Sequence, residues 1–418
     1  MKYVIIGNSA AAIGTVQGIR EYDKDGQIVL ISDESYHTYS RPLISYWLLG
    51  KVTEENMRYR NTDFYEKNNV DTLFSTKVTS VDANSKEVII ENGNRISYDK
   101  LMIATGSKPF VPPMDGLDTV EKKFTFMNLD SAKAVKEALD CNANSTYAAK
   151  VLIVGAGLIG LKAAEAMEHM NVQMTVIDLA DRILPSILDV NSSATMQKYI
   201  ESKGVKFILN TSVTKFDKNK AVLKTGETLD FDILILAVGV RPNTELVAEA
   251  GGKVNRGIVT DQTQLTSLNN VYSAGDCTES FDISSNTNKI LALLPNAFAQ
   301  GEIAGRNMAG KTFNYINAIP MNAIGFFGLH IITAGSYEGE AYVEADGNNY
   351  KKLVVADGKL KGFILMGDVT RAGIYTSMIK EQIALDDVDF ETLKHRPQMM
   401  VFNKVRRVNK LGGISLED

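Results

Sequence analysis

Two stretches of the chain repeat one order of apolar and polar positions. Each begins with a short apolar run, at residues 2–6 and 151–154, and continues through a turn of small residues into a helix-compatible segment, at 13–21 and 161–169. A second apolar run then ends on an acidic residue. A strand, a tight turn, a helix and a second strand in this order are typical of a βαβ unit that binds a dinucleotide. The pattern therefore predicts an α/β chain with two Rossmann-like units.

The first unit has a turn of small residues rather than a full glycine fingerprint. Gly7 allows the sharp turn, and Ser9 and Ala12 are small enough for the backbone to approach a pyrophosphate. The helix that follows presents free N–H groups and a partial positive charge to phosphates. Asp33 and Glu34 end the second apolar run, where an acid accepts hydrogen bonds from ribose hydroxyls. Because the fingerprint has glycine where Ser9 and Ala12 stand, packing explains this turn equally well when it is taken alone.

The second unit carries the complete fingerprint. A G-x-G-x-x-G turn directly follows the apolar run, and Asp178 ends the next run 23 positions after Gly155, close to the ~20 typical of a ribose-binding acid. A carboxylate there repels a 2′-phosphate and favours NAD over NADP, although the nearby Arg182 weakens that preference. The predicted contacts of the second dinucleotide are Gly155, Gly157, Leu158, Ile159, Gly160, Asp178 and Gly239.

Each unit is followed by a strand, a glycine turn and a proline, at residues 101–109 and 233–242. This internal duplication predicts two dinucleotide ligands on one chain. We expect a first dinucleotide domain at residues 1–115 and 245–318, a second at 116–244, and a C-terminal domain at 319–418.

Composition excludes several classes of function. The 418 residues are 44% hydrophobic and 23% charged with a net charge of −5, so no basic field points to nucleic acid. No apolar run is long enough to span a bilayer, and we expect neither a membrane contact nor a secretory signal. Cys141 and Cys277 form no C-x-x-C pair and the four histidines are scattered, so we expect no metal site. These features indicate a cytoplasmic protein.

Taken together, residues 1–375 resemble the flavoproteins with two dinucleotide-binding domains, which are FAD- and NAD(P)H-dependent pyridine nucleotide reductases. Within them the chain looks like rubredoxin and ferredoxin reductases and the flavin half of nitrite reductases. The motifs that carry this likeness are Asp33-Glu34, Tyr39-x-Arg41-Pro42 and Gly275-Asp276. The resemblance implies three-layer FAD and NAD domains with FAD and NAD(H) as cofactors. It implies FAD contacts at Gly7, Ser9, Ala10, Ala11, Asp33, Glu34, Arg41, Pro42, Val78, Ala104, Thr105, Gly106, Gly275, Asp276 and Leu294.

The chain departs from the disulfide-reducing relatives. Pro42 stands where those proteins have a redox cysteine, Cys141 lies in a polar stretch, and Cys277 is better explained as a small buried residue. The glutathione-reductase class also has a C-terminal catalytic histidine beside an acid, and His395, between two basic residues, has no such setting. We therefore do not expect disulfide reductase chemistry.

A second departure concerns a charged pair. In many relatives a lysine near flavin N5 pairs with a glutamate two residues after the last glycine of the NAD motif, and these two positions hold Tyr46 and Lys162 here. Our hypothesis is that Lys162 is the catalytic cation, supplied from the opposite side, which stabilises a negatively charged reduced flavin or orients the nicotinamide. The alternative is that Lys162 is a solvated helix residue.

The C-terminal region has a different pattern. Strand-like runs between residues 321 and 365 and a helix over 374–382 resemble the family's α+β interface domain, which forms homodimers or packs under the FAD domain. The last stretch is basic: a solvated tail is the simpler interpretation, and a docking surface for an acidic electron carrier or partner subunit is the alternative. Its basic residues are Lys394, His395, Arg396, Lys404, Arg406, Arg407 and Lys410.

The resemblance implies that NADH gives a hydride to flavin N5 and that the electrons then leave to an acceptor. We expect rubredoxin or a similar small iron–sulfur protein, because no cysteine is placed to reduce a thiol acceptor. The alternatives are a flavoprotein subunit of a nitrite reductase or 2-oxoacid dehydrogenase complex, an NADH oxidase that reduces O₂, and a flavin-bound sensor without enzymatic activity.

Overall fold

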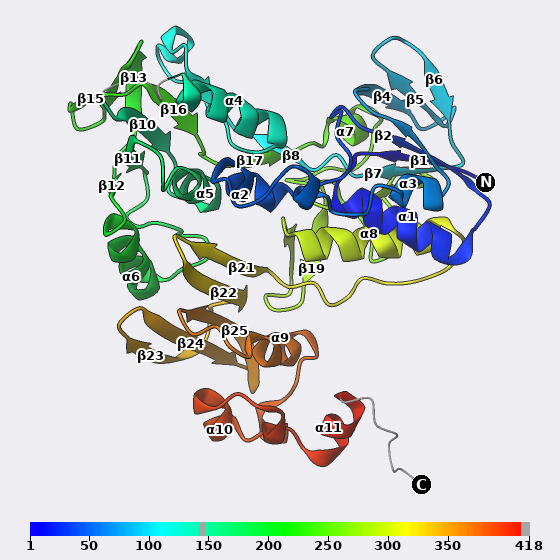
Figure 1. Cartoon of the computed structure of the whole chain (residues 1–418). Helices are drawn as coiled ribbons and strands as arrows, with labels where there is room; N and C mark the ends of the chain where they lie inside the picture. Colours follow the sequence, from blue (N-terminus) through cyan, green and yellow to red (C-terminus); the bar gives the residue numbers. More distant parts are fainter. Residues whose placement is uncertain (142–146, 411–418) are drawn as a thin grey trace. The chain divides into compact units, whose positions relative to one another are not determined.

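The computed structural model describes residues 1–141 and 147–410, with the side chains of residues 409 and 410 left out, so that of Lys410 lies outside the description (Figure 1). Two compact units are formed. The first comprises Met1–Ser280 and Lys289–Tyr315, and the second comprises Phe281–Asn288 and the described residues from Ile316 onwards. In the described residues, no helix is both long and apolar enough to cross a membrane.

A five-stranded parallel sheet organises the first part of the chain, with the strand order β18-β7-β1-β2-β3. The apolar run at the N-terminus is its central strand, which explains why it is apolar on both faces. The strands are β1 (Lys2–Ile6), β2 (Gln27–Ile31), β3 (Val70–Leu73), β7 (Lys100–Ile103) and β18 (Val271–Ser273).

This sheet is the middle of three layers. Successive side chains of a strand point to opposite faces: Tyr3 and Ile5 join the core under two helices, whereas Val4 and Ile6 join the core under a small antiparallel sheet. The layers are helices α1 (Ala10–Tyr22) and α8 (Leu294–Met308) on one face and strands β4 (Val78–Asp82), β5 (Glu87–Ile90) and β6 (Arg95–Ser97) on the other. The predicted three-layer FAD-type domain is confirmed.

Glycines allow α1 and α8 to pack with their backbones in contact. A Cβ atom at Gly14 would lie 2.2 Å from the carbonyl oxygen of Phe298, and one at Gly301 would lie 1.9 Å from that of Ala11. Any larger residue would push the helices apart. The close packing joins the helix after the first glycine turn to the helix that follows Gly275 in the sequence.

A second five-stranded parallel sheet, of order β12-β11-β10-β16-β9, repeats this arrangement. Its helices α4 (Leu129–Asp140), α5 (Leu158–Ala166) and α6 (Val190–Glu201) accompany it, and a three-stranded antiparallel sheet packs on the core that contains Leu152 and Leu234. The strands are β9 (Lys123–Phe124), β10 (Ala149–Val154), β11 (Val172–Ile177), β12 (Val205–Ile208) and β16 (Ile233–Leu236), with β13 (Val213–Asp217), β14 (Lys220–Leu223) and β15 (Thr228–Asp230) in the small sheet. The predicted duplication is therefore visible in the fold.

The second unit is an antiparallel sheet of order β21-β22-β25-β24-β23 with helices. Phe363 and Leu365 of β25 pack with Tyr375 and Met378 of α9 in its core. Its elements are β21 (Met321–Phe326), β22 (Leu329–Gly335), β23 (Glu340–Asp346), β24 (Asn349–Ala356), β25 (Lys359–Met366), α9 (Ala372–Lys380), α10 (Phe390–His395) and α11 (Lys404–Lys410). The predicted C-terminal α+β domain is confirmed as a fold.

Helix starts differ from the sequence prediction. The helices expected at 13–21 and 161–169 begin three residues earlier, as α1 at Ala10 and α5 at Leu158, because each starts directly at its glycine turn, with Ser9 and Gly157 as N-cap residues. The short strand β9 was not expected. Division of the chain at residues 115, 245 and 319 stays a prediction.

Candidate functional site

The first glycine turn is built so that only glycine fits. Gly7 follows β1 with φ +117°, and its N–H donates to the carbonyl oxygen of Ile31 at 2.8 Å. A Cβ at this position would lie 2.2 Å from the carbonyl oxygen of Ala104. Helix α1 begins with Ala10 and Ala11, and the first N–H groups of a helix have no partner within it. The turn therefore directs backbone donors at the carboxyl end of the sheet, where α/β folds bind ligands.

The second glycine turn has the same geometry. Gly155 has φ +115°, its N–H donates to Ile177 at 2.7 Å, and a Cβ would lie 2.2 Å from the carbonyl oxygen of Ala237. A Cβ at Gly160 would lie 1.9 Å from Gly155, whereas one at Gly157 would meet open space. Gly155 and Gly160 are thus required by packing. Gly157 is not required by packing, and its contact with a dinucleotide stays a prediction. Leu158 and Ile159 form the first turn of α5.

Asp178 closes the second turn. Its Oδ2 accepts from the N–H of Ala156 at 2.6 Å, and its Oδ1 accepts from the N–H of Ala180 at 2.8 Å. Each carboxylate oxygen can accept a further hydrogen bond, so the fixed carboxylate can still bind ribose hydroxyls. Arg182 pairs instead with Asp181, at 2.8 Å.

The acids of the first βαβ unit, Asp33 and Glu34, are arranged differently from Asp178. Asp33 is exposed, whereas Glu34 forms an ion pair with Arg41 and accepts a hydrogen bond from the hydroxyl of Tyr39 at 2.8 Å. The same Tyr39 oxygen accepts from the N–H of Leu129 at 3.1 Å, which ties this cluster to the start of α4. Arg41 and Pro42 lie in a short 3₁₀ helix, Arg41–Leu43, ahead of α2 (Ile44–Leu48).

The third motif comes close to the first turn. A Cβ at Gly275, which has φ +86°, would lie 3.2 Å from Cβ of Ala11, and the N–H of Gly275 donates to Oε1 of Gln300 at 2.7 Å. Burial raises the pKa of the neighbouring Asp276 to about 6, and the positive charge of Arg41 acts in the opposite direction. A carboxylate held at this cost is typical of a binding site, because a polar ligand would supply the hydrogen bonds that burial removes.

The segments that contain Gly106 and Gly239, one after each βαβ unit, lie side by side. Strands β8 (Ser107–Pro109) and β17 (Val240–Pro242) pair antiparallel. Thr105 Oγ1 donates to the carbonyl oxygen of Asn243 at 2.9 Å, Asn243 Nδ2 returns a bond to Thr105 at 2.8 Å, and its N–H donates to Gly106 at 2.9 Å. Gly239, with φ +116°, accepts from the N–H of Phe110 at 2.9 Å. Asn243 was not foreseen, because its role depends on this pairing.

Two predicted FAD contacts lie in the outer layers. Val78 is the first residue of β4 and belongs to the core under the small antiparallel sheet. Leu294 opens α8 and is partly buried. The FAD and NAD contacts as a set stay a prediction.

Lys162 lies in α5, and its side chain is 12% exposed. Its ammonium forms an ion pair with the carboxylate of Glu165, which is 5% exposed, and lies 4.3 Å from the ring centroid of Tyr46 in α2. The interpretation of Lys162 as a solvated residue is therefore wrong. Glu165 was missed, although its spacing of three residues from Lys162 on a helix was a signal for the pair.

The cysteines and His395 are placed as follows. Cys141 is exposed and Cys277 is buried, and both are free thiols. The expectation that His395 has no nearby acid is wrong, because β23 brings Oε1 of Glu344 to 2.9 Å from its Nδ1. The pKa of Glu344 is lowered to about 2, first by Lys351 and also by Tyr342 and His395. This cluster is on the surface of the second unit.

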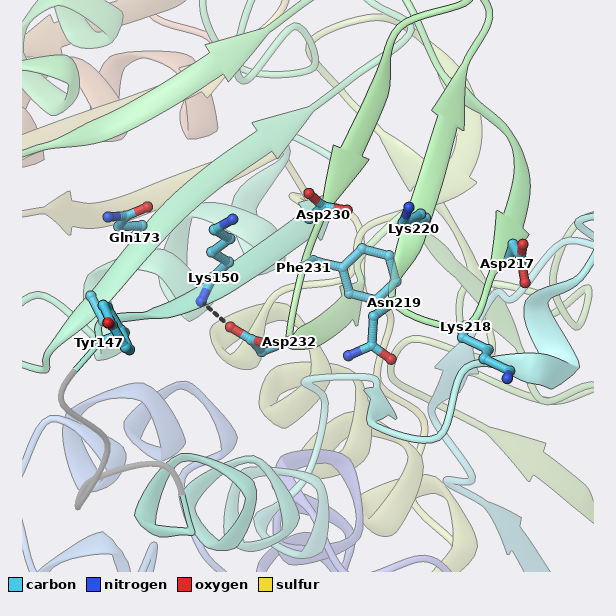
Figure 2. Close-up of a pocket in the computed structure, with 11 residues that line it drawn as sticks. Tyr147, Lys150, Gln173, Asp217, Lys218, Asn219, Lys220, Asp230, Phe231 and Asp232 are labelled. Atoms are coloured by element: carbon cyan, nitrogen blue, oxygen red, sulfur yellow. Dashed lines mark hydrogen bonds between the residues drawn. The ribbon is translucent and has the colours of Figure 1, made fainter.

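A surface pocket lies away from the motifs (Figure 2). Lys150 and Gln173 line it from the amino-end halves of β10 and β11, and the backbone N–H of Lys150 donates to Asp232 at 2.7 Å. Ligands of α/β sheets bind at the opposite, carboxyl ends of the strands. Because the predicted contacts do not line this pocket, we do not assign the cofactor sites to it.

Comparison with known proteins agrees with this geometry. Residues 1–301 match the family described as pyridine nucleotide-disulphide oxidoreductase. The chain belongs to this family. Residues 320–383 match the rubredoxin NAD⁺ reductase C-terminal domain. The fold is that of an FAD- and NAD(H)-dependent oxidoreductase, as predicted.

Individual relatives cover most of the chain. An NADH oxidase of Methanocaldococcus jannaschii is 33% identical over 74% of this chain and 70% of its own. The NADH-dependent phenylglyoxylate dehydrogenase subunit epsilon of Aromatoleum evansii is 29% identical over 90% of this chain and 91% of its own. The solved structure of an NAD-dependent persulfide reductase from A. fulgidus has a TM-score of 0.84 at 27% identity and covers 93% of this chain and 78% of its own.

Proposed function

We propose that the protein is an FAD-dependent NADH:acceptor oxidoreductase that delivers electrons to a small redox protein. The observation that carries this proposal is the pair of glycine turns with one geometry, each at the carboxyl end of its own parallel sheet. Two such turns in one unit fit two dinucleotides, and the β8–β17 pairing with Thr105 and Asn243 joins the segments that follow them.

The residues divide between two cofactors. FAD would be held by the Gly7 turn, by Arg41 and by Asp276, whereas NADH would be held by Gly155, Gly157 and Asp178. Bound FAD supplies hydride acceptance and the release of electrons one at a time. The protein orients the two dinucleotides: backbone N–H groups at α1 and α5 hold phosphates, and acids at the strand ends hold hydroxyls.

A one-electron iron protein such as rubredoxin is the acceptor that we favour. The match of residues 320–383 to a rubredoxin reductase domain supports it. Pro42 stands where a redox cysteine would be needed for thiol chemistry, and Cys277 is buried.

A second candidate is a flavoprotein subunit of a larger complex. The phenylglyoxylate dehydrogenase subunit, whose match covers both chains almost fully, favours this candidate. The basic segment near the C-terminus would then be a subunit contact. There Arg406 pairs with Asp387 at 3.0 Å, and Met400 and Val405 are exposed. An NADH oxidase that reduces O₂ is a third candidate, by likeness to the Methanocaldococcus jannaschii protein.

One experiment separates these candidates. The purified protein is mixed with NADH without oxygen while flavin absorbance is followed, and rubredoxin, ferredoxin or air is then added to separate samples. We expect fast bleaching and fastest reoxidation by rubredoxin. Bleaching without efficient reoxidation would favour the subunit, and a protein without flavin, or with flavin that NADH leaves oxidised, would overturn the proposal.

The same proposal includes a homodimer and a cytoplasmic location. Gel filtration of the purified protein tests the first, and fractionation of the cells that produce it tests the second.

A further inference from the structure

A buried charge pair in the first unit is unexplained by packing. Lys162 and Glu165 lie on one face of α5 and are 12% and 5% exposed. A buried ion pair is a weak source of stability, because the cost of removing two charges from water offsets most of their attraction. The retention of both charges in an otherwise apolar helix of sequence LIGLKAAEA therefore suggests a use for one of them.

A third residue, Tyr46, contacts the Lys162–Glu165 pair from another part of the sequence. The Lys162 ammonium lies 4.3 Å from the ring centroid of Tyr46, where the negative face of the aromatic ring attracts a cation. Lys51 lies over the same ring at 6.0 Å but is exposed. The ring and the Glu165 carboxylate together hold one ammonium in a defined place.

That place lies where α2 and α5 are in contact. Helix α5 begins at the Gly155 turn. Tyr46 in α2 lies five residues after Arg41, whose charge acts on Asp276. A cation on this contact is close to the elements that would hold both dinucleotides.

We propose that Lys162 is the fixed positive charge that stabilises the extra electron density of reduced flavin, with Glu165 and Tyr46 as positioning residues that hold it. The inference rests on the proposed function, because it needs FAD bound in the first unit. A fixed cation in a water-poor site acts strongly on nearby charge and needs no reorganisation when that charge develops. The cation thus comes from the helix of the NAD motif.

The test is the midpoint potential of the bound FAD, measured by equilibration with redox dyes. Lys162→Met should lower the ratio of reduced to oxidised flavin about tenfold at a given applied potential, which is about 30 mV for a two-electron couple. Lys162→Arg keeps the charge and should stay near the parent value. Lys51→Met is the matched control, because it removes a lysine from the same ring at the exposed position, and it should leave the potential unchanged.

Neutral substitutions of Tyr46 test the positioning role. Tyr46→Leu removes the aromatic face and should lower the reduced-to-oxidised ratio about threefold, whereas Tyr46→Phe keeps the face and should match the parent protein. A purely structural tyrosine would change the melting temperature without this separation of the two variants. Equal potentials for Leu and Phe would overturn the positioning role.

Lys162→Met leaves the Glu165 carboxylate buried without its lysine and can fail to fold. The double variant Lys162→Met/Glu165→Met then carries the test, and a smaller lowering is expected, because the negative charge of Glu165 is lost together with the positive charge of Lys162. Parent-like potentials in variants that contain a full complement of FAD would overturn this inference alone. A parent protein that binds no FAD would instead overturn the proposed function.

Discussion

The two glycine turns of the first compact unit, at Gly7 and Gly155, have the same backbone conformation but differ in the acid beside them. Gly7 and Gly155 have φ values of +117° and +115°, and a Cβ on either would lie 2.2 Å from a carbonyl oxygen of the neighbouring strand end. In the second turn Asp178 accepts from two backbone N–H groups. In the first turn Glu34 is instead engaged by Arg41 and Tyr39.

This difference teaches how one fold serves two ligands. The backbone of each turn presents N–H groups to any pyrophosphate, so it does not distinguish FAD from NAD(H). We expect the side chains beside the turn to make this distinction. We predict that Asp178, which backbone N–H groups hold, binds the exchangeable NAD(H). We predict that the Glu34–Arg41–Tyr39 cluster, which joins the segment after β2 to the start of α4, serves the resident FAD.

The largest effect is expected from an added methyl group at either turn. Gly7→Ala and Gly155→Ala each place a Cβ 2.2 Å from a backbone carbonyl oxygen, at a residue whose φ is positive. Each substitution should destabilise the conformation of its turn by several kcal/mol. We expect Gly7→Ala to purify without FAD. Gly155→Ala should retain FAD but lose reduction by NADH. Flavin absorbance and stopped-flow reduction measure the two outcomes, and equal loss of FAD in both variants would contradict the division of the sites.

The next effect concerns pH and Asp276. Its pKa is raised from 3.8 to about 6, so the folded protein without FAD binds a proton more tightly than the unfolded chain. Stability from this group is present below pH 4 and is lost as the pH rises through 6, which amounts to about 3 kcal/mol. Asp276→Asn should therefore raise the melting temperature of the FAD-free protein at pH 7 and weaken FAD binding.

Thermal melts at pH 4.5 and pH 7 check this prediction. The increase in melting temperature from Asp276→Asn should be smaller at pH 4.5. Asp33→Asn is the matched control, because Asp33 is exposed on the same domain. A variant that is no more stable than the parent at pH 7 would show that Asp276 is not a strained carboxylate.

Asp178→Ala should weaken the second site by about 2 kcal/mol, because it removes the acceptor of two backbone N–H groups and of the ribose. We expect kcat/KM for NADH to fall about 30-fold and the preference for NADH over NADPH to shrink. Asp181→Ala, which removes the partner of Arg182, is the control and should keep most activity with NADH. Unchanged discrimination in Asp178→Ala would separate this acid from cofactor choice.

The smallest effect is expected at Gly157, where a Cβ meets open space. Gly157→Ala should leave the melting temperature unchanged and weaken NADH binding about tenfold, or ~1.4 kcal/mol, by filling the approach of the pyrophosphate. Titration of the protein with NAD⁺ measures this. A normal affinity would mean that the pyrophosphate does not approach Gly157 closely.

Local sequence patterns determined the two βαβ units, since an apolar run, a glycine turn and a helix are decided by interactions between near neighbours. The sequence also shows directly that Pro42, and not a cysteine, follows Arg41. Helix starts were placed three residues late, because a helix that begins in a glycine turn has few local signals.

Only the tertiary structure decided which residues act together. Lys162 meets Tyr46, Thr105 meets Asn243, and Glu344 meets His395 through contacts between elements distant in sequence. Such contacts depend on how sheets and helices pack. The sequence does not distinguish a charged residue that is solvated from one that is buried. The sequence alone could therefore identify the cofactor motifs, whereas the burial of Lys162 and its pairing with Glu165 required the fold.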